Sequence, residues 1–369
     1  MTKELMRGSH VLGEAAIRAG CRYYFGYPIT PQNEVPEYMS GRLLDVDGIF
    51  IQAESELSAV NMMIGAAMAG GRVMTSSSSP GISLKQEGIS YLAGQELPAV
   101  IANMIRGGPG LGNIAPAQSD YFQATRGGGH GDYRCLVLAP DSCQELCDLT
   151  YGSFDLADKY RNPVMILGDG LMGQMMEPVE FPEMIDPESL PKKDWILDGK
   201  NGRDSRIILS LLLDPKALEA HNYKLTRKYD AMTRAEQRWE EHLCDDAELV
   251  VVAYGTAARI VKGAIKRVRE MGMKVGLFRP ISLWPFPSEA LNQLSRRVRH
   301  LLAFEMSAGQ MVEDVEIAVK GQAQVYFYGR PGGVIPTPDE VAHQISHYYH
   351  SAHLPMGDAG QARQAGGAA

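Results

Sequence analysis

Cysteine is scarce in this sequence, and its placement excludes two classes of protein. Only five of the 369 residues are cysteines, and only Cys143 and Cys147 lie close together. A small, odd set gives no disulfide framework. An iron–sulfur cluster held by this chain alone would need a fuller set of thiolates at close, fixed spacing. The segment that carries Cys143 and Cys147 reads as a helix, so we interpret both as packing side chains and predict no metal site.

Long apolar runs and an excess of positive charge are also missing. The longest apolar run, residues 207–213, is far shorter than the ~18 residues of a membrane span. Lys and Arg number 36 against 44 Asp and Glu, which gives a net charge of −8. Sequence-independent nucleic-acid binding needs a basic surface. The N-terminus lacks the apolar core of a signal peptide. We therefore expect a cytoplasmic protein that binds neither nucleic acid nor membrane.

The usual glycine motifs of nucleotide binding are absent as well. No GxGxxG follows the first predicted strand, and no GxxxxGK[ST] occurs. This excludes the simplest NAD and ATP sites, and with them a nicotinamide dehydrogenase. Gly168-Asp169-Gly170 resembles the metal- and diphosphate-binding motif of thiamine diphosphate enzymes, but the next Asn, Asn201, is too distant and follows a Pro-rich loop. We interpret this triplet as a structural strand end.

What is present is an alternation of short apolar runs with helical patterns. Strands are predicted at 22–26, 48–53, 72–76, 98–104, 134–139 and 163–168. Helices are predicted between them at 10–20, 33–43, 54–70, 82–93 and 141–160. Such alternation with fully apolar strands predicts an α/β fold, a doubly wound parallel sheet covered on both faces.

Residues 177–247 break this rhythm and predict a second domain beyond them. A stretch rich in Pro and charge leads into a polar, helix-like run at 229–246, which we interpret as an inter-domain connection with a helix. Strand–helix alternation resumes at 248 and ends near 350, and its Pro-rich turn at 279–287 cannot be regular helix. Residues 351–369 have no apolar period, so we expect a disordered tail.

Glycine-rich and polar loops follow three of the first predicted strands. They are residues 27–31, 76–81 and 106–113. The carboxyl ends of parallel strands meet at one edge of the sheet, where ligands of such folds bind. Glycine there lets a ligand approach the backbone closely. The sequence therefore predicts a ligand site at this edge.

The motifs on these loops resemble one family. They are YPITP, QAESELSAVNMMIGAAMAG, SPGISLKQEGISYLAGQELP, MIRGGPGLGN, SDYFQATRGGGHGDYR and DLADKYRNPVMILGDG. Together they are similar to the alpha-type subunits of 2-oxoacid:ferredoxin oxidoreductases, in the branch of the 2-oxoisovalerate and 2-oxoglutarate enzymes. The likeness covers residues 8–350 and includes FEMSAGQM and FYGRPGG. It implies the pyrimidine-binding domain of a thiamine diphosphate enzyme at 1–235, with a linker from about 177. A smaller transketolase-C-terminal-like α/β domain follows at 248–350.

This resemblance implies a function that needs partner subunits. The expected reaction is the coenzyme A-dependent oxidative decarboxylation of a 2-oxoacid, with electrons passed to ferredoxin. A beta subunit would share thiamine diphosphate with this chain and hold its diphosphate and Mg²⁺. The iron–sulfur clusters would lie in partners, which include gamma or ferredoxin-like subunits. We expect a dimer of such heteromers.

The substrate and the catalytic status remain open at this stage. A branched-chain 2-oxoacid such as 2-oxoisovalerate is favoured, because RGGPGLGN and GGGHGDYR look more like that branch. 2-Oxoglutarate is the alternative and would need another cation for its second carboxylate. A non-catalytic assembly subunit that keeps the fold is the alternative from another class.

By the resemblance, Glu56 is the glutamate that activates the cofactor. Its carboxylic acid would share a proton with the aminopyrimidine ring and favour the imino tautomer, which takes up the proton of the thiazolium carbon. Glu54 is the rival, but counting back from Gly65 and Gly70, which align with the family's helix glycines, favours Glu56. Both glutamates also suit the first turn of a helix.

The remaining site residues follow from the same motifs. Thr30 and Arg106 match the family's groups for the substrate carboxylate, and a guanidinium is suited to bidentate carboxylate binding. Cofactor binding is expected at Tyr27, Pro28, Ile29 and Glu56. The sequence departs from the family at Ser79, where a glycine-like residue is common.

Overall fold

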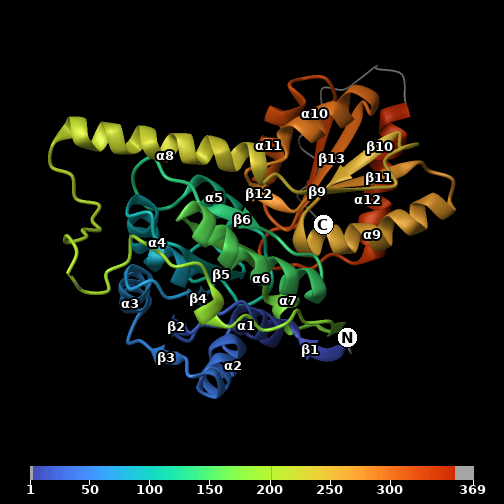
Figure 1. Cartoon of the computed structure of the whole chain (residues 1–369). Coiled ribbons are helices and arrows are strands. Elements are labelled where there is room, and N and C mark those ends of the chain that lie inside the picture. The colour runs from blue at the N-terminus through green and yellow to red at the C-terminus, as the bar shows by residue number, and fades with distance from the viewer. Residues whose placement is uncertain (1–2, 201, 354–369) are drawn as a thin grey trace.

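The computed structural model describes residues 3–200 and 202–353, and these form two lobes, each built around a sheet (Figure 1). The N-terminal lobe holds a seven-stranded sheet in the order β12-β6-β7-β5-β4-β2-β3. Its strands are β2 (Tyr23–Gly26), β3 (Ile49–Gln52), β4 (Val73–Ser77), β5 (Ala99–Ile105), β6 (Leu136–Leu138), β7 (Pro163–Asp169) and β12 (Ser282–Trp284). All pair in parallel except β12, which is antiparallel to β6.

Helices cover both faces of this sheet, as the fully apolar strands require. The helices are α1 (Gly8–Arg18), α2 (Glu34–Arg42), α3 (Glu56–Met68), α4 (Ser79–Gly94), α5 (Tyr121–Arg126), α6 (Cys143–Tyr160) and α7 (Gly170–Gln174), with a 3₁₀ turn η1 (Leu44–Val46). Helices α3 and α4 share one buried cluster with the strands, and α1, α2 and α6 share another. Every residue of β5 is buried, so this strand lies between both layers.

The C-terminal lobe repeats the plan on a smaller scale. Its sheet has the order β14-β13-β10-β11-β9, with β9 antiparallel and the others parallel. The strands are β9 (Trp239–His242), β10 (Leu249–Val252), β11 (Val275–Pro280), β13 (His300–Glu305) and β14 (Gln324–Gly329). The helices are α9 (Gly255–Glu270), α10 (Ser288–Arg297), α11 (Met311–Val319) and α12 (Pro338–His353). Helices α9 and α12 cover one face, while α10 and α11 join the cluster that continues into the N-terminal lobe.

The stretch between the two alternating regions contains more structure than predicted. β8 (Met176–Val179) pairs antiparallel with β1 (Glu4–Arg7), and a 3₁₀ turn η2 (Pro187–Ser189) precedes the long helix α8 (Pro215–Ala235). Figure 1 shows α8 reaching towards the C-terminal lobe. The predicted helical run at 229–246 is wrong beyond residue 235, because Trp239–His242 is the strand β9. Its residues alternate in exposure as an edge strand against β11 does.

Three other features bear on the predictions. The predicted Pro-rich turn at 279–287 contains β12, which joins the sheet of the other lobe. Strand β7 ends at Asp169, whose carboxylate accepts hydrogen bonds of 3.0 Å from the backbone N–H groups of Leu171 and Met172. The triplet around Asp169 is thus a strand end and helix cap, as predicted. The predicted tail was placed at 351–369, but residues 351–353 are the end of α12, and the rest lies outside the described residues.

None of the helices in residues 3–200 and 202–353 combines the length and the apolar character that crossing a membrane requires.

Candidate functional site

The predicted site residues gather at one edge of the N-terminal sheet. Thr30 lies on the loop after β2, and Arg106 comes directly after β5. The Arg106 guanidinium donates hydrogen bonds to the backbone carbonyls of Thr30 (2.9 Å) and Leu111 (3.0 Å). Glu56 begins α3, the helix that follows β3, and packs against the first turn of α4. The edge predicted from the loop positions is therefore where the structure brings Thr30, Arg106 and Glu56.

Glu56 is held by the start of its helix but leaves its carboxylate unbonded. Ser55 caps α3, and its hydroxyl accepts a hydrogen bond of 3.2 Å from the Ser58 N–H. The Glu56 side chain is buried, with 6% of its surface exposed. Among the described residues, none donates a hydrogen bond to the Glu56 carboxylate. The carboxylate oxygens are not among the fully buried polar atoms that lack a partner, so they still reach solvent and can accept a hydrogen bond from a ligand.

A glycine makes room for this carboxylate. Gly81 lies in the first turn of α4, and a Cβ there would stand 2.7 Å from Glu56 Oε1 and 2.1 Å from Ser77 Oγ. Both separations are shorter than real Cβ contacts allow. The position therefore needs glycine if Glu56 is to occupy its place.

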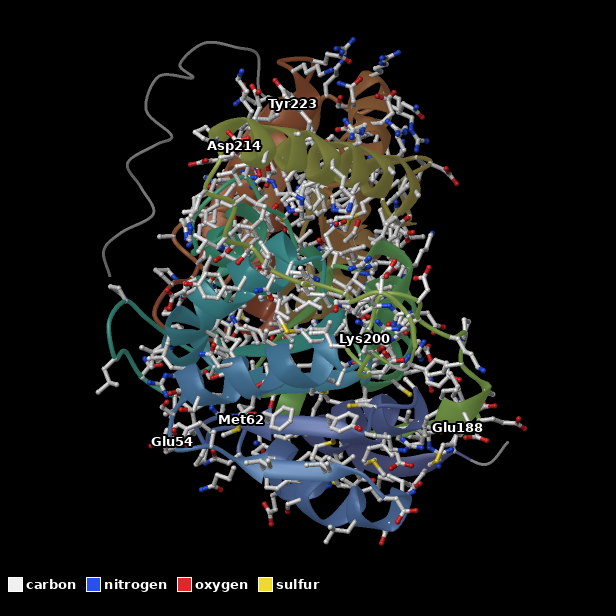
Figure 2. The ribbon with its side chains drawn as sticks, turned by 60° about the vertical axis from the view of Figure 1, so that its left-hand side comes forward. Glu54, Met62, Glu188, Lys200, Asp214 and Tyr223 are labelled. Atoms are coloured by element: carbon white, nitrogen blue, oxygen red, sulfur yellow. The ribbon has the colours of Figure 1, made fainter. Side chains whose placement is uncertain are left out.

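The rival glutamate lies in a different environment. Glu54 is exposed. Figure 2 shows it on the outside of the molecule, close to the N-terminal end of α3. Its Oε1 accepts a hydrogen bond of 2.5 Å from Ser58 Oγ, which lowers the pKa of the Glu54 carboxyl. The structure thus separates the two glutamates: Glu54 has a partner and faces solvent, whereas Glu56 is buried and has none.

Arg106 is a buried cation without a counter-ion. Its side chain is 7% exposed, and its Nε atom has no hydrogen-bond partner. Within the described part of the chain, no carboxylate comes within ion-pair distance of Arg106. Taking a guanidinium out of water without a counter-ion costs free energy. The position therefore suits an anionic ligand such as a carboxylate.

Other buried polar atoms at the same edge also lack partners. Ser77 Oγ and Ser78 Oγ end β4 and precede α4, and Gln32 Nε2 lies on the loop after β2. The side-chain oxygen of Gln32 accepts a hydrogen bond from the Ser76 hydroxyl. Buried polar groups in proteins nearly always have a partner. Together with Glu56, these atoms supply hydrogen-bonding groups of the kind that a polar ligand such as an aminopyrimidine would need.

The departure at Ser79 is accommodated by hydrogen bonds. Ser79 has a φ of 24°, a region that glycine favours. Its hydroxyl donates to Asp120 Oδ2 (2.7 Å) and accepts from the Arg106 N–H (3.0 Å), while its own N–H donates to Asn103 (3.1 Å). This serine therefore ties the start of α4 to the end of β5 and helps to fix the Arg106 backbone.

The three remaining predicted residues lie on the loop between β2 and α2. Tyr27 and Pro28 are exposed, and Ile29 is half-buried with its carbonyl accepting from the Gln32 N–H at 3.1 Å. No hydrogen bond in the described residues joins their side chains to Glu56. The structure places them on the same loop as Thr30, and their expected part in cofactor binding stays a prediction.

One charged residue near the site escaped the sequence analysis. Lys85 on α4 is fully buried, and its Nζ donates to Thr75 Oγ1 at 3.1 Å. The signal was available, because Lys85 falls three residues after Ile82 and four before Ile89, on the buried face of the helix.

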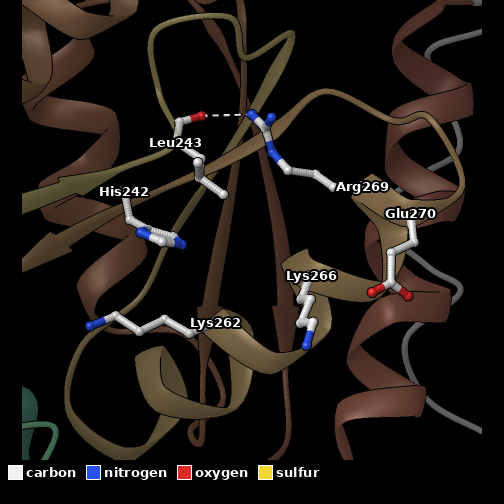
Figure 3. A pocket seen from close by; sticks show the side chains of 6 residues that line it. All are labelled: His242, Leu243, Lys262, Lys266, Arg269 and Glu270. Atoms are coloured by element: carbon white, nitrogen blue, oxygen red, sulfur yellow. Dashed lines mark hydrogen bonds between the residues drawn. The ribbon is translucent and has the colours of Figure 1, made fainter.

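A different pocket lies on the C-terminal lobe. It measures about 510 Å³ and is lined by His242, Leu243, Lys262, Lys266, Arg269 and Glu270 (Figure 3). Lys262 already pairs with Asp141 and Glu240, and Arg269 donates to the Leu243 carbonyl at 2.8 Å. The three basic residues and Glu270 lie on α9, whereas His242 ends β9 and Leu243 follows it, and none of the six is a predicted site residue.

Comparisons with known proteins place the chain in a family. Residues 14–240 match the family described as pyruvate flavodoxin/ferredoxin oxidoreductase, thiamine diphosphate-binding. Residues 247–341 match pyruvate:ferredoxin oxidoreductase core domain II. Thus a thiamine diphosphate-binding family covers more than half of the chain.

Relatives of known function agree. The chain is 50% identical over 333 residues, 90% of this chain and 94% of the relative, to ketoisovalerate oxidoreductase subunit VorB of Methanothermobacter marburgensis. It is 37% identical over 372 residues, 94% of this chain and 99% of the relative, to 2-oxoglutarate synthase subunit KorA of Methanothermobacter thermautotrophicus. Both relatives are named as subunits of larger enzymes.

Solved structures confirm the predicted fold. A 2-oxoglutarate:ferredoxin oxidoreductase from Magnetococcus marinus superposes with a TM-score of 0.83 at 24% identity, and 94% of this chain is covered. This chain spans 65% of that one, just under two thirds. A split-gene transketolase gives a TM-score of 0.57 at 13% identity, covering 94% of this chain and 98% of the other. The chain therefore belongs to the thiamine diphosphate-binding pyruvate flavodoxin/ferredoxin oxidoreductase family and is a 2-oxoacid oxidoreductase subunit.

Proposed function

We propose that the chain is the pyrimidine-binding subunit of a coenzyme A-dependent 2-oxoacid:ferredoxin oxidoreductase that acts on a branched-chain 2-oxoacid such as 2-oxoisovalerate. The choice of substrate rests on the difference in sequence identity, which is 50% to the ketoisovalerate relative and 37% to the 2-oxoglutarate relative. The buried Arg106, which has no counter-ion among the described residues, supports an active rather than an assembly subunit, because its charge costs stability unless an anionic ligand meets it.

Glu56 is proposed to hold the proton that the cofactor exchanges. When bound, thiamine diphosphate supplies the carbon nucleophile that attacks the 2-oxo group. The Glu56 carboxyl group has free hydrogen-bonding capacity and lies beside Gly81, where no side chain takes up space. It can therefore hydrogen-bond a ring nitrogen of the aminopyrimidine. Ser55 fixes the helix turn from which Glu56 projects, and this fixes the direction of the carboxyl group.

Arg106 is proposed to bind the carboxylate that every 2-oxoacid carries. Two of its N–H groups hold it in place through the carbonyls of Thr30 and Leu111, so the remaining donors are pre-oriented. The Thr30 hydroxyl accepts a weak 3.5 Å hydrogen bond from Asn33 and can turn its own O–H towards the same carboxylate. Orientation by fixed donors lowers the entropic cost of bringing substrate and cofactor together.

The site is proposed to be half of a composite one. Apolar side chains are exposed around the edge that holds Glu56 and Arg106: Leu57, Met62, Leu84, Leu111 and Ile114. Exposed apolar groups clustered beside a site are typical of an interface. We propose that a diphosphate-binding beta subunit covers them and brings the diphosphate and Mg²⁺, and that gamma or ferredoxin-like subunits carry the clusters for ferredoxin. We propose that two such heteromers form a dimer. Within this chain, the pyrimidine-binding domain would span 1–235 and the transketolase-C-terminal-like domain 248–350.

2-Oxoglutarate is the second candidate substrate. The likeness to 2-oxoglutarate synthase subunits favours it. A dicarboxylate needs a cation beyond Arg106, and the beta subunit would have to supply it. A 2-oxoglutarate preference would therefore also locate part of the substrate pocket in the partner.

The test is a substrate panel on the complex isolated without oxygen from its native source. Coenzyme A-dependent reduction of a low-potential dye is measured with 2-oxoisovalerate, 2-oxoglutarate, pyruvate and an aryl 2-oxoacid. The proposal predicts the highest kcat/KM for 2-oxoisovalerate. Highest activity with 2-oxoglutarate would move the assignment to the second candidate. No activity with any acid, in a complex shown to hold thiamine diphosphate and intact clusters, would contradict the proposal.

A further inference from the structure

Lys85 is a fully buried lysine with little to hold it there. The Lys85 side chain has 0% exposure, and one hydrogen bond to Thr75 Oγ1 satisfies one of its three donors. Thr75 gives its own hydroxyl proton to the Phe25 carbonyl at 2.6 Å, so its lone pair faces the ammonium. Across the described residues, no carboxylate lies within ion-pair distance of Lys85. An ammonium in this position is expensive, since an apolar side chain would fill the space without the desolvation cost.

The position of Lys85 on α4 directs its side chain towards the turn that lies against Glu56. Gly81 and Lys85 are one turn apart on α4, and long helical side chains lean towards the N-terminus of their helix. Lys85 therefore lies over the turn that contains Gly81, and Glu56 Oε1 lies against the same glycine. Lys85 and Glu56 thus both belong to the surroundings of Gly81, although the described residues contain no direct ion pair between them.

The electrostatics agree with this placement. Burial lowers the pKa of the Lys85 ammonium from 10.5 to about 8, and the Glu56 carboxylate opposes that fall. In the described part of the chain, α3 contributes Glu56 as the charged group acting on Lys85, and β4 contributes only the neutral hydroxyl of Thr75. A lysine with a pKa near 8 is still mostly protonated at neutral pH.

We propose that Lys85 is a positioning residue whose buried ammonium stabilises the ionised Glu56 carboxylate over Gly81, and so favours transfer of a proton from Glu56 to the aminopyrimidine of the cofactor. In this step the O–H bond of Glu56 breaks and an N–H bond forms on the ring, while Lys85 keeps its protons. The inference rests on the proposed function, because it assigns the proton on Glu56 to that ring. It explains why α4 keeps a costly charge on its buried face.

The sign of the pH dependence follows from burial. A lysine whose folded pKa is lowered destabilises the fold in its charged form, fully below pH about 8, and this penalty fades as pH rises towards 10.5. Replacement of Lys85 by Met keeps the length and removes the charge. The K85M chain should therefore unfold at a higher temperature than wild type at pH 7, and the difference should shrink between pH 8 and 10.5.

The functional test uses the reconstituted complex and the exchange of the cofactor's C2 hydrogen with deuterium from D₂O. K85M should slow this exchange about tenfold at pH 7, the effect of a one-unit shift in proton affinity. The KM for the 2-oxoacid should stay unchanged. Wild type should lose exchange rate as pH rises past about 8, and K85M should lack that descending limb. K85R keeps the charge and should recover most of the rate.

Two controls separate the possible failures. K266M removes an exposed lysine of α9 and should change neither unfolding nor exchange. If E56Q exchanges the hydrogen normally, the proposed function fails. If E56Q abolishes exchange while K85M retains the wild-type rate and pH profile, the role of Lys85 alone is overturned. A K85M chain that is less stable than wild type at pH 7 would also overturn it, because Lys85 would then be a structural residue.

Discussion

The contact between the two lobes and the edge of the N-terminal sheet bury similar charges in opposite ways. At the lobe contact, Arg279 is 4% exposed and donates to Glu145 at 2.7 and 2.8 Å and to Glu240 at 2.7 Å. These carboxylates raise the pKa of Arg279. At the sheet edge, Arg106 is as deeply buried but bonds only to carbonyl oxygens. One arginine is neutralised within the fold and the other is not.

The buried glutamates show the same contrast. Glu305 ends β13, and its carboxylate accepts from the Ser307 hydroxyl and from the backbone N–H groups of Gln310, Met311 and Val312, which lead into α11. Glu56 also lies at a helix start, yet its carboxylate has no donor among the described residues. Fully partnered charges hold the architecture together, whereas Arg106 and Glu56 keep hydrogen-bonding capacity that, in our proposal, a ligand uses.

The sharpest break in this comparison is the replacement of Glu56 by Gln. We expect kcat of the reconstituted complex to fall about 10²–10⁴-fold, the usual value of a positioned acid or base. The free energy of unfolding should change by less than about 0.5 kcal/mol, because no hydrogen bond is lost. Steady-state turnover and chemical unfolding of the same preparation measure both. E54Q is the matched control and should retain full turnover; equal losses in both variants would contradict the assignment.

Replacement of Arg279 by Met should do the opposite. Removing it leaves Glu145 without a cation, while Asp141 and Glu240 keep only Lys262, so the chain should lose about 3 kcal/mol of stability. Urea denaturation measures this loss. Turnover per folded complex should be close to wild type, since the partners of Arg279 are Glu145, Asp141 and Glu240 and not the proposed site residues. A stable R279M chain would show that the lobe contact does not depend on these pairs.

Replacement of Arg106 by Met should reduce binding rather than folding. We expect kcat/KM for the preferred 2-oxoacid to fall about 100-fold. This fall corresponds to about 2.7 kcal/mol, which lies in the range of about 2–5 kcal/mol lost when a buried charge loses its partner. Stability should stay level or rise, because an unpaired buried cation is removed. R106K keeps the charge but not the planar fork, so its kcat/KM should lie between those of R106M and wild type. An unchanged KM in R106M would argue against carboxylate binding at this position.

The smallest of these effects is expected for Gly81. A Cβ there would displace the Glu56 carboxylate without altering any charge, so G81A should lower kcat about tenfold. Gly65 on α3 has open space around it, and G65A should leave kcat unchanged while stabilising the helix by about 0.5–1 kcal/mol. The pair of alanine variants thus separates crowding of Glu56 from a general effect on helices. Equal kcat in both would mean that the place of Glu56 is not critical.

The sheet was predictable because its strands are short and mostly apolar runs. The run at 98–104 became β5 within one residue at each end, since Asn103 is the only polar residue in this strand, which is buried on both faces. Strand β9 was missed because Trp239–His242 is a polar edge strand in a helix-like sequence, and only pairing with β11 makes it extended. β12 depends likewise on a partner from the other lobe.

The site was predictable in part for a similar reason. Loop positions after β2 and β5 placed Thr30 and Arg106 at one edge, and the structure joins them by a hydrogen bond. Burial, which the sequence does not give, is what separates Glu56 from Glu54. Lys85 was overlooked because a lysine in an amphipathic helix is ordinarily solvent-exposed, and only the three-dimensional packing of α3 on α4 shows its position.

The most direct test compares E56Q and R279M in one experiment. Turnover and the fraction of folded complex are both measured at each urea concentration, and turnover is expressed per folded complex. The account predicts that E56Q unfolds at the wild-type urea concentration with turnover almost lost. R279M should unfold at a much lower concentration, with normal turnover while it remains folded. The account would be contradicted if E56Q kept its turnover, or if both variants lost turnover and stability together.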